Sequence, residues 1–175
     1  MSIYKLFGLP AHPLLVHLPV VGIPLLTLAV AAMVLRPQWR RSWALPLALV
    51  GVVLAIATVV AAGAGEKLAE HVRETATLEQ HEELGEQLRT LMLVFAGTLV
   101  LYALLARGKA SAALSRAALV VGVASLALGV VSTVWTVRAG HAGAKSVWSD
   151  VTERPQKSLD RERWERGRDS DGDRS

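Results

Sequence analysis

Histidine is the residue type in this sequence with the most chemical potential, because all five histidines lie in or beside long apolar segments. His12 and His17 stand at the opening of the first such segment, with Pro13 and Pro19 between and after them. A neutral imidazole binds a metal ion through one ring nitrogen, and two imidazoles from separate helices can hold a six-coordinate b-type haem. The histidines therefore indicate a cofactor site if the fold brings two of them together.

The apolar segments themselves predict an integral membrane protein. The chain has 175 residues, of which 52% are hydrophobic, and these residues come in blocks instead of amphipathic stripes. A helix needs at least about 17 apolar residues to cross a bilayer. We expect an all-α four-helix bundle in residues 1–149 and a disordered, charged tail in residues 150–175, with a short helix near Leu159 to Arg166. The predicted spans are about 14–35, 43–64, 90–106 and 117–137.

The residue types that are missing from the sequence and its spans argue against several classes of function. None of the four spans contains Asp, Glu, Lys or Arg, which argues against a proton-coupled carrier. No polar stripe runs through a span, so a passive channel is disfavoured. The sequence has no cysteine and therefore no thiolate ligand. Its basic residues are not interleaved with aromatic ones, so we expect no nucleic-acid binding. No spacing identifies a catalytic residue, and an enzymatic activity is left open.

The loops predict how the bundle is oriented. The connections between spans one and two and between spans three and four are short, basic and free of acids, and such loops tend to stay in the cytoplasm. We therefore expect a multi-pass protein of the inner (cytoplasmic) membrane with both termini outside. All five histidines and all fifteen acids then share the outer face. The basic residues of the two short loops are Arg36, Arg40, Arg41, Arg107, Lys109 and Arg116.

Local patterns indicate which histidines face the bundle. Thr77-Leu-Glu-Gln80 has the pattern of a capping box, so a helix is expected to begin there and run into span three. On that helix His81 shares a stripe with Leu84 and Leu88, and Gly85 would leave a gap beside the ring. His17 lies about one turn inside span one. His71 lines up with apolar residues before the third helix, and His141 follows span four among glycines.

Taken together, these motifs resemble the bacterial four-helix membrane proteins catalogued as domain of unknown function 2231. The resemblance covers about residues 8–148 and implies a small integral membrane domain with histidines near one face. Some proteins of this kind occur beside respiratory or cytochrome proteins, which makes such proteins expected partners and a haem role plausible. The motifs are His12-Pro13, His17-Leu-Pro19, His81 and Gly140-His-Ala-Gly-Ala-Lys-Ser-Val-Trp148.

The leading functional hypothesis is a haem-binding, cytochrome-like electron carrier or accessory subunit. His17 and His81 are the preferred axial ligands of haem b, and His141 or His71 could replace either or serve a second site. Basic groups such as Arg89 or Arg138 could pair with the haem propionates. The competing metal hypothesis is a copper or zinc site at His17, His81 and His141, with carboxylates such as Glu70 or Glu82 nearby.

A structural role is the alternative in a different class. His17 could bond to a carbonyl that Pro19 or Pro24 leaves free, and His81 could pack among the loops. His12 and His71 are expected to be structural or solvated instead of ligating. The protein would then be a non-catalytic structural or assembly component that docks partners through its helices. The lipid bilayer is the expected environment in either case, and a homo-oligomer is left open.

Overall fold

The fold is a bundle of four long helices in which consecutive helices run in opposite directions. The computed structural model describes residues 5–6, 8–72, 74–108 and 111–172. A two-stranded antiparallel hairpin of β1 (Lys5–Leu6) and β2 (Leu9–Pro10) comes first, and Gly8 forms its turn with a φ of +82°. The helices that follow are α1 (Ala11–Leu15), α2 (His17–Leu35), the 3₁₀ turn η1 (Pro37–Trp39), α3 (Arg40–Ala69), α4 (Ala76–Arg107) and α5 (Ala112–Gly172).

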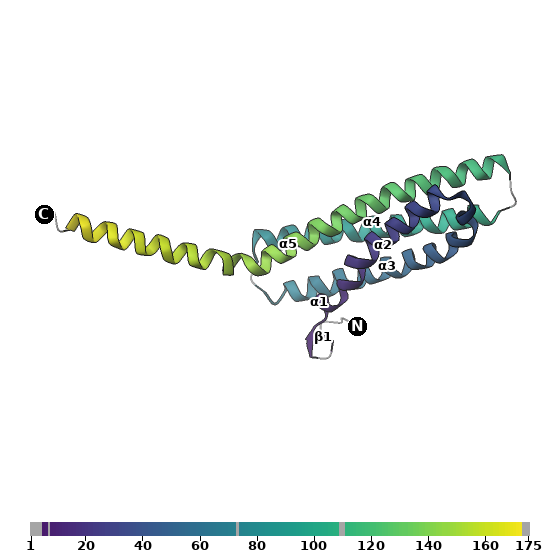
Figure 1. The fold of residues 1–175 in the computed structure, drawn as a ribbon. Helices are drawn as coiled ribbons and strands as arrows, with labels where there is room; N and C mark the ends of the chain where they lie inside the picture. The colour runs from purple at the N-terminus through teal and green to yellow at the C-terminus, as the bar shows by residue number, and fades with distance from the viewer. Residues whose placement is uncertain (1–4, 7, 73, 109–110, 173–175) are drawn as a thin grey trace.

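The four long helices close into a ring of neighbours. Helix α2 packs against α3 and α5, and α4 packs against α3 and α5 (Figure 1). The short connections α2–α3 and α4–α5 lie at one end of the bundle, which we call the arginine end. The opposite end holds α1, the α3–α4 connection and residues 138–148 of α5, and we call it the histidine end. All five histidines belong to the histidine end, as the order of the spans predicts.

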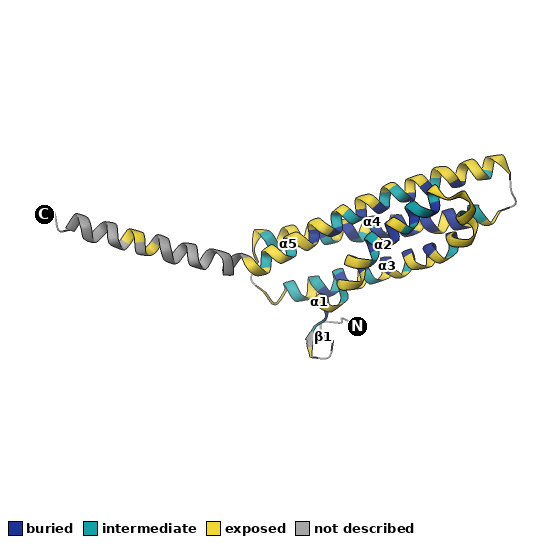
Figure 2. Ribbon diagram, viewed as in Figure 1, coloured by how far each residue is buried: buried dark blue, intermediate teal, exposed yellow. Residues whose placement is uncertain are grey.

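The bundle is apolar inside and largely apolar outside. Ile23, Val30, Met92 and Phe95 are buried in one continuous core, whereas Leu28 remains 66% exposed on the outer face of α2. Figure 2 shows buried positions on the facing sides of the helices and exposed positions on their outer sides. A coat of exposed leucine and valine suits a lipid solvent. Within the described residues, four helical segments are long and apolar enough to cross a membrane: Ala11–Leu35, Pro37–Ala69, Ala76–Arg107 and Ala112–Trp148.

Glycine lets the helices approach closely inside the membrane segment. A Cβ atom on Gly129 of α5 would lie 2.9 Å from both Phe95 Cζ and Thr27 Oγ1, so α5 meets α2 and α4 there through its backbone. Thr27 Oγ1 also lies 3.2 Å from Thr133 Oγ1 and donates to the Ile23 carbonyl at 2.9 Å. Small residues at helix crossings of this kind are typical of membrane bundles.

Two boundaries differ from those that the sequence predicts. The N-cap of helix α4 is Thr75, two residues before the predicted N-cap Thr77, because the Thr75 hydroxyl accepts from the Leu78 amide at 3.2 Å; the Thr77 hydroxyl lies 3.1 Å from that of Thr75. The backbone of α5 continues as a helix to Gly172, beyond the apolar span (Figure 1). Disorder of residues 150–175 remains a prediction.

Candidate functional site

The imidazoles of His12 and His81 meet at the histidine end of the bundle. Their ring centroids are 5.8 Å apart and their planes are nearly perpendicular, at 82°. The two residues come from α1 and from the first turns of α4, so 68 residues of intervening chain fold back to bring the rings together. Both side chains are partly buried. This pair is the site in the described chain where two histidines from separate helices converge.

Each of the two rings is fixed by a hydrogen bond to the backbone of a neighbouring helix. His12 Nδ1 lies 2.8 Å from the carbonyl oxygen of Ala61 on α3, and His81 Nδ1 lies 2.8 Å from the carbonyl oxygen of Ala139 on α5. A carbonyl oxygen only accepts, so Nδ1 must be the protonated nitrogen of each ring. In the neutral imidazole Nε2 then carries the lone pair, and among the described residues neither Nε2 has a hydrogen-bond partner.

A glycine one turn beyond each acceptor makes room for the ring. A Cβ atom on Gly65 would lie 2.9 Å from His12 Cε1 and Nδ1, and a Cβ atom on Gly143 would lie 2.9 Å from His81 Cε1. Real Cβ contacts essentially never come this close. Each imidazole therefore lies directly against the backbone of the helix to which it is bonded, and any larger residue at either glycine would push the ring away.

His12 and His81 are held in the same way, and the residues that hold them belong to a sequence motif that occurs twice. Ala61 and Gly65 stand in Ala61-Ala-Gly-Ala-Gly-Glu-Lys67, and the matching residues of α5 stand in Ala139-Gly-His-Ala-Gly-Ala-Lys145. Both segments read Ala-x-x-x-Gly-x-Lys, and each lies in the candidate membrane span that follows the span with the histidine near its start. This repeat was not among the sequence predictions, although it is visible as internal similarity between the two halves of the chain.

The other three histidines are exposed, unlike this pair. His17 is exposed at the start of α2 and His141 is exposed on α5. His71, also exposed, lies with Nδ1 2.9 Å from the Lys67 carbonyl oxygen. The ring that meets His81 is therefore His12, which the sequence analysis treated as structural or solvated, and the geometry does not favour His17. Ligand roles for His17, His71 and His141 remain predictions.

In the part of the chain that the structure describes, carboxylates do not complete a metal site around the histidines. Within the described residues, no group of three or more His, Cys, Asp or Glu side chains is placed to hold a metal ion. Glu70, one of the carboxylates expected near a metal, instead bonds to the Lys67 ammonium at 2.6 Å, and this contact lowers the pKa of the Glu70 carboxyl. The copper or zinc site predicted from the sequence is thus without support from the side-chain positions.

A polar rim surrounds the histidine end. Arg89 of α4 bridges Glu66 of α3 at 3.3 Å and Glu86 of its own helix at 3.2 Å, which links the two helices. The indole Nε1 of Trp135 donates to Gln87 Oε1 at 2.7 Å. Arg138 lies over the Trp135 ring, 5.1 Å from its centroid. The Arg89 guanidinium, which together with Arg138 was an example of a group that could pair with haem propionates, is therefore already paired with carboxylates.

These features define an integral membrane four-helix bundle in which the same arrangement occurs twice at one end. We call this arrangement the histidine clamp: a histidine ring bonded to a helix carbonyl and packed against a glycine, formed by His12, Ala61 and Gly65 and again by His81, Ala139 and Gly143. The chain belongs to the family described as predicted membrane protein (DUF2231), whose model matches residues 8–154. This confirms the resemblance found from the histidine and glycine motifs, and the match includes both copies of the Ala-x-x-x-Gly-x-Lys unit. The chain matches no curated protein and no solved structure.

Proposed function

We propose that His12 and His81 are the axial ligands of a b-type haem and that the protein is a cytochrome-like electron carrier or accessory subunit of the membrane. The observation that carries the proposal is the ring pair itself. Two imidazoles from different helices lie 5.8 Å apart, and each has its Nδ1 proton directed to a backbone carbonyl. Such a bond to the second nitrogen is the usual way in which proteins orient a metal-binding histidine.

The separation of the rings suits one shared iron atom. A metal–imidazole bond measures about 2.0–2.1 Å, so two imidazoles that share a metal have their ring centres about 6 Å apart. The observed 5.8 Å is close to this value. Because the backbone bonds hold both Nδ1 atoms, Nε2 is the nitrogen left to each ring for a ligand.

The number of ligands favours haem over a bare ion. Zinc and copper(II) sites in proteins use three or four side chains, whereas the described residues offer two histidines and no third ligand beside them. Haem iron has four positions filled by the macrocycle and needs two axial ligands. Open space is also present at this end, since Cβ atoms built on Gly63 and Gly85 meet nothing within 4 Å.

A bound haem would supply reversible one-electron chemistry through its iron. The chain's own contribution is to present two neutral imidazoles in fixed orientation at the edge of the apolar bundle. If the short arginine loops are cytoplasmic, the site faces the outer side of the inner membrane. There it would exchange electrons with respiratory or cytochrome proteins at that surface.

The same geometry also favours a structural function as the second candidate. The hydrogen bond of His12 ties α1 to α3, and that of His81 ties α4 to α5. The ring contact then joins the two pairs of helices. In this case the histidines close the end of the bundle, and the protein serves in assembly or docking without a cofactor.

A visible spectrum of the full chain tests the haem proposal. The protein is produced with a haem precursor and purified in mild detergent, and we expect a Soret band that is lost in His12→Ala and in His81→Ala. The matched controls are His17→Ala and His71→Ala, which remove exposed histidines from the same end of the bundle and should keep the band. A colourless wild-type protein under these conditions, or a band that survives loss of both His12 and His81, would contradict the proposal. Zinc or copper found by elemental analysis in a colourless protein would favour the metal alternative.

A further inference from the structure

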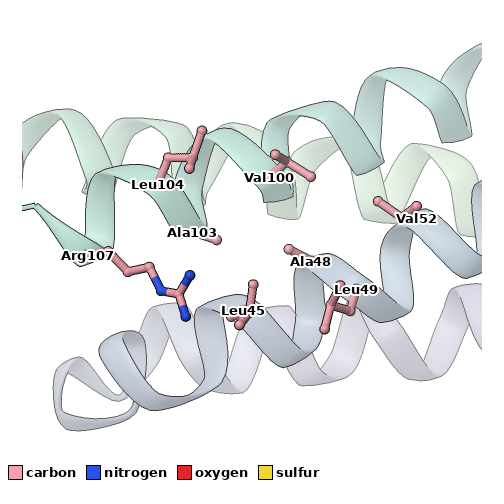
Figure 3. Close-up of a pocket in the computed structure, with 8 residues that line it drawn as sticks. All are labelled: Leu45, Ala48, Leu49, Val52, Val100, Ala103, Leu104 and Arg107. Atoms are coloured by element: carbon pink, nitrogen blue, oxygen red, sulfur yellow. The ribbon is translucent and has the colours of Figure 1, made fainter.

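A groove opens between α3 and α4 at the arginine end, far from the histidine pair. It has a volume of about 180 Å³ and lies between the α3 residues from Leu45 to Val52 and the α4 residues from Val100 to Arg107 (Figure 3). An apolar cavity of about 150 Å³ is large enough to hold benzene, so this groove can hold a similar volume of hydrocarbon. The residues that line it are Leu45, Ala48, Leu49, Val52, Val100, Ala103, Leu104 and Arg107.

Arg107 is the charged member of this lining. It is the last residue of α4, and Figure 3 shows its side chain reaching across the groove toward α3, near Leu45. Among the described residues its guanidinium has neither an ion-pair partner nor a hydrogen-bond partner. The neighbouring Arg40 differs, because its Nη2 donates to the Val34 carbonyl at 2.7 Å. The groove therefore combines an apolar floor with an unpaired cation at its end.

The sequence around the groove favours an anion as the partner of this cation. The connection between α2 and α3 and the connection between α4 and α5 carry basic residues and no Asp or Glu. Arginine presents a planar fork of N–H groups that binds phosphate in a bidentate manner. At the end of a membrane span, such a guanidinium lies at the level of the lipid headgroups.

From these observations we infer that the groove binds an anionic phospholipid, with an acyl chain along α3 and α4 and the phosphate on Arg107. A second copy of the chain is a poorer occupant, because packing a helix here would bury the Arg107 charge without a carboxylate to meet it. A lipid satisfies both parts of the site at once, since its tail covers the apolar floor and its phosphate pairs with the guanidinium. This inference does not depend on the haem proposal.

Native mass spectrometry of the detergent-purified protein tests the site. Phosphatidylglycerol and phosphatidylcholine of equal chain length are titrated against the wild type, Arg107→Gln and Val100→Trp, the last of which fills the groove from a partly exposed position. A charge-assisted hydrogen bond contributes enough for about a tenfold change in affinity. Both lipids carry a phosphate, but phosphatidylcholine adds a choline cation that would lie beside the basic loops. We therefore expect the wild type to prefer phosphatidylglycerol and both variants to lose about tenfold in its binding.

Arg41→Gln is the matched control, because it removes an exposed arginine from the same end without touching the groove lining. It should retain the preference for phosphatidylglycerol. Equal binding of the two lipids by the wild type, or an unchanged preference in Arg107→Gln, would overturn the inference. So would a wild-type dimer that Val100→Trp converts to a monomer without changing lipid binding, because the groove would then be an interface between copies.

Discussion

The contact between each histidine ring and its glycine predicts how glycine-to-alanine substitutions change the stability of the bundle. Gly65→Ala would place a Cβ atom 2.9 Å from two atoms of the His12 ring, and the ring can move only by leaving the Ala61 carbonyl. Gly63→Ala, two residues earlier on the same helix, would place its Cβ atom in open space. The two variants make the same chemical change and differ only in what the new methyl group meets.

The expected change in the free energy of unfolding is the sum of three contributions. Overpacking costs about 1–3 kcal/mol, and a lost hydrogen bond costs about 0.5–1.5 kcal/mol. Replacing glycine by alanine within a helix stabilises it by about 1 kcal/mol. Gly65→Ala should therefore lower the free energy of unfolding by about 2 kcal/mol, whereas Gly63→Ala should raise it by up to about 1 kcal/mol.

Reversible unfolding in mixed micelles, with sodium dodecyl sulfate added to a mild detergent, measures both free energies in one assay. The repeat provides an independent second pair, because Gly143→Ala meets the His81 ring at 2.9 Å while Gly140→Ala meets nothing within 4 Å. Equal stabilities within either pair would refute the claim that the imidazoles rest on these glycines. A further check is Gly65→Ala combined with His12→Ala, in which the added methyl group should no longer be destabilising.

Two other predictions concern groups outside the clamp. Tyr102→Phe should stabilise the bundle by about 1 kcal/mol in the same unfolding assay, because the hydroxyl is buried without a hydrogen-bond partner among the described residues; a destabilised variant would mean that the hydroxyl has a partner. Glu66→Gln should lower stability by less than about 1 kcal/mol, because the pair with Arg89 is exposed and Arg89 keeps Glu86. The loss should shrink further at high salt, and a larger or salt-independent loss would contradict this assignment.

The sequence alone was sufficient for the class of protein and its four spans. Blocks of apolar residues long enough to cross a bilayer have few other structures open to them, because every backbone polar group in lipid must be satisfied within the helix. The resemblance to the family rested on short motifs with unusual residues for a membrane segment, such as His12-Pro13 and the glycine-rich segment around His141. Helical periodicity also indicated that His81 faces the bundle, where it is partly buried.

Only the tertiary structure decided which histidine meets His81. In the sequence His17 lies deeper in the first span and was the better candidate. In the structure, however, the helix is interrupted between α1 and α2, and α2 begins with His17 exposed. The short helix α1 instead turns His12 toward α3, where the Ala61 carbonyl and the space above Gly65 receive the ring. A contact between residues 69 positions apart depends on how helices cross, and neither periodicity nor hydropathy records that crossing.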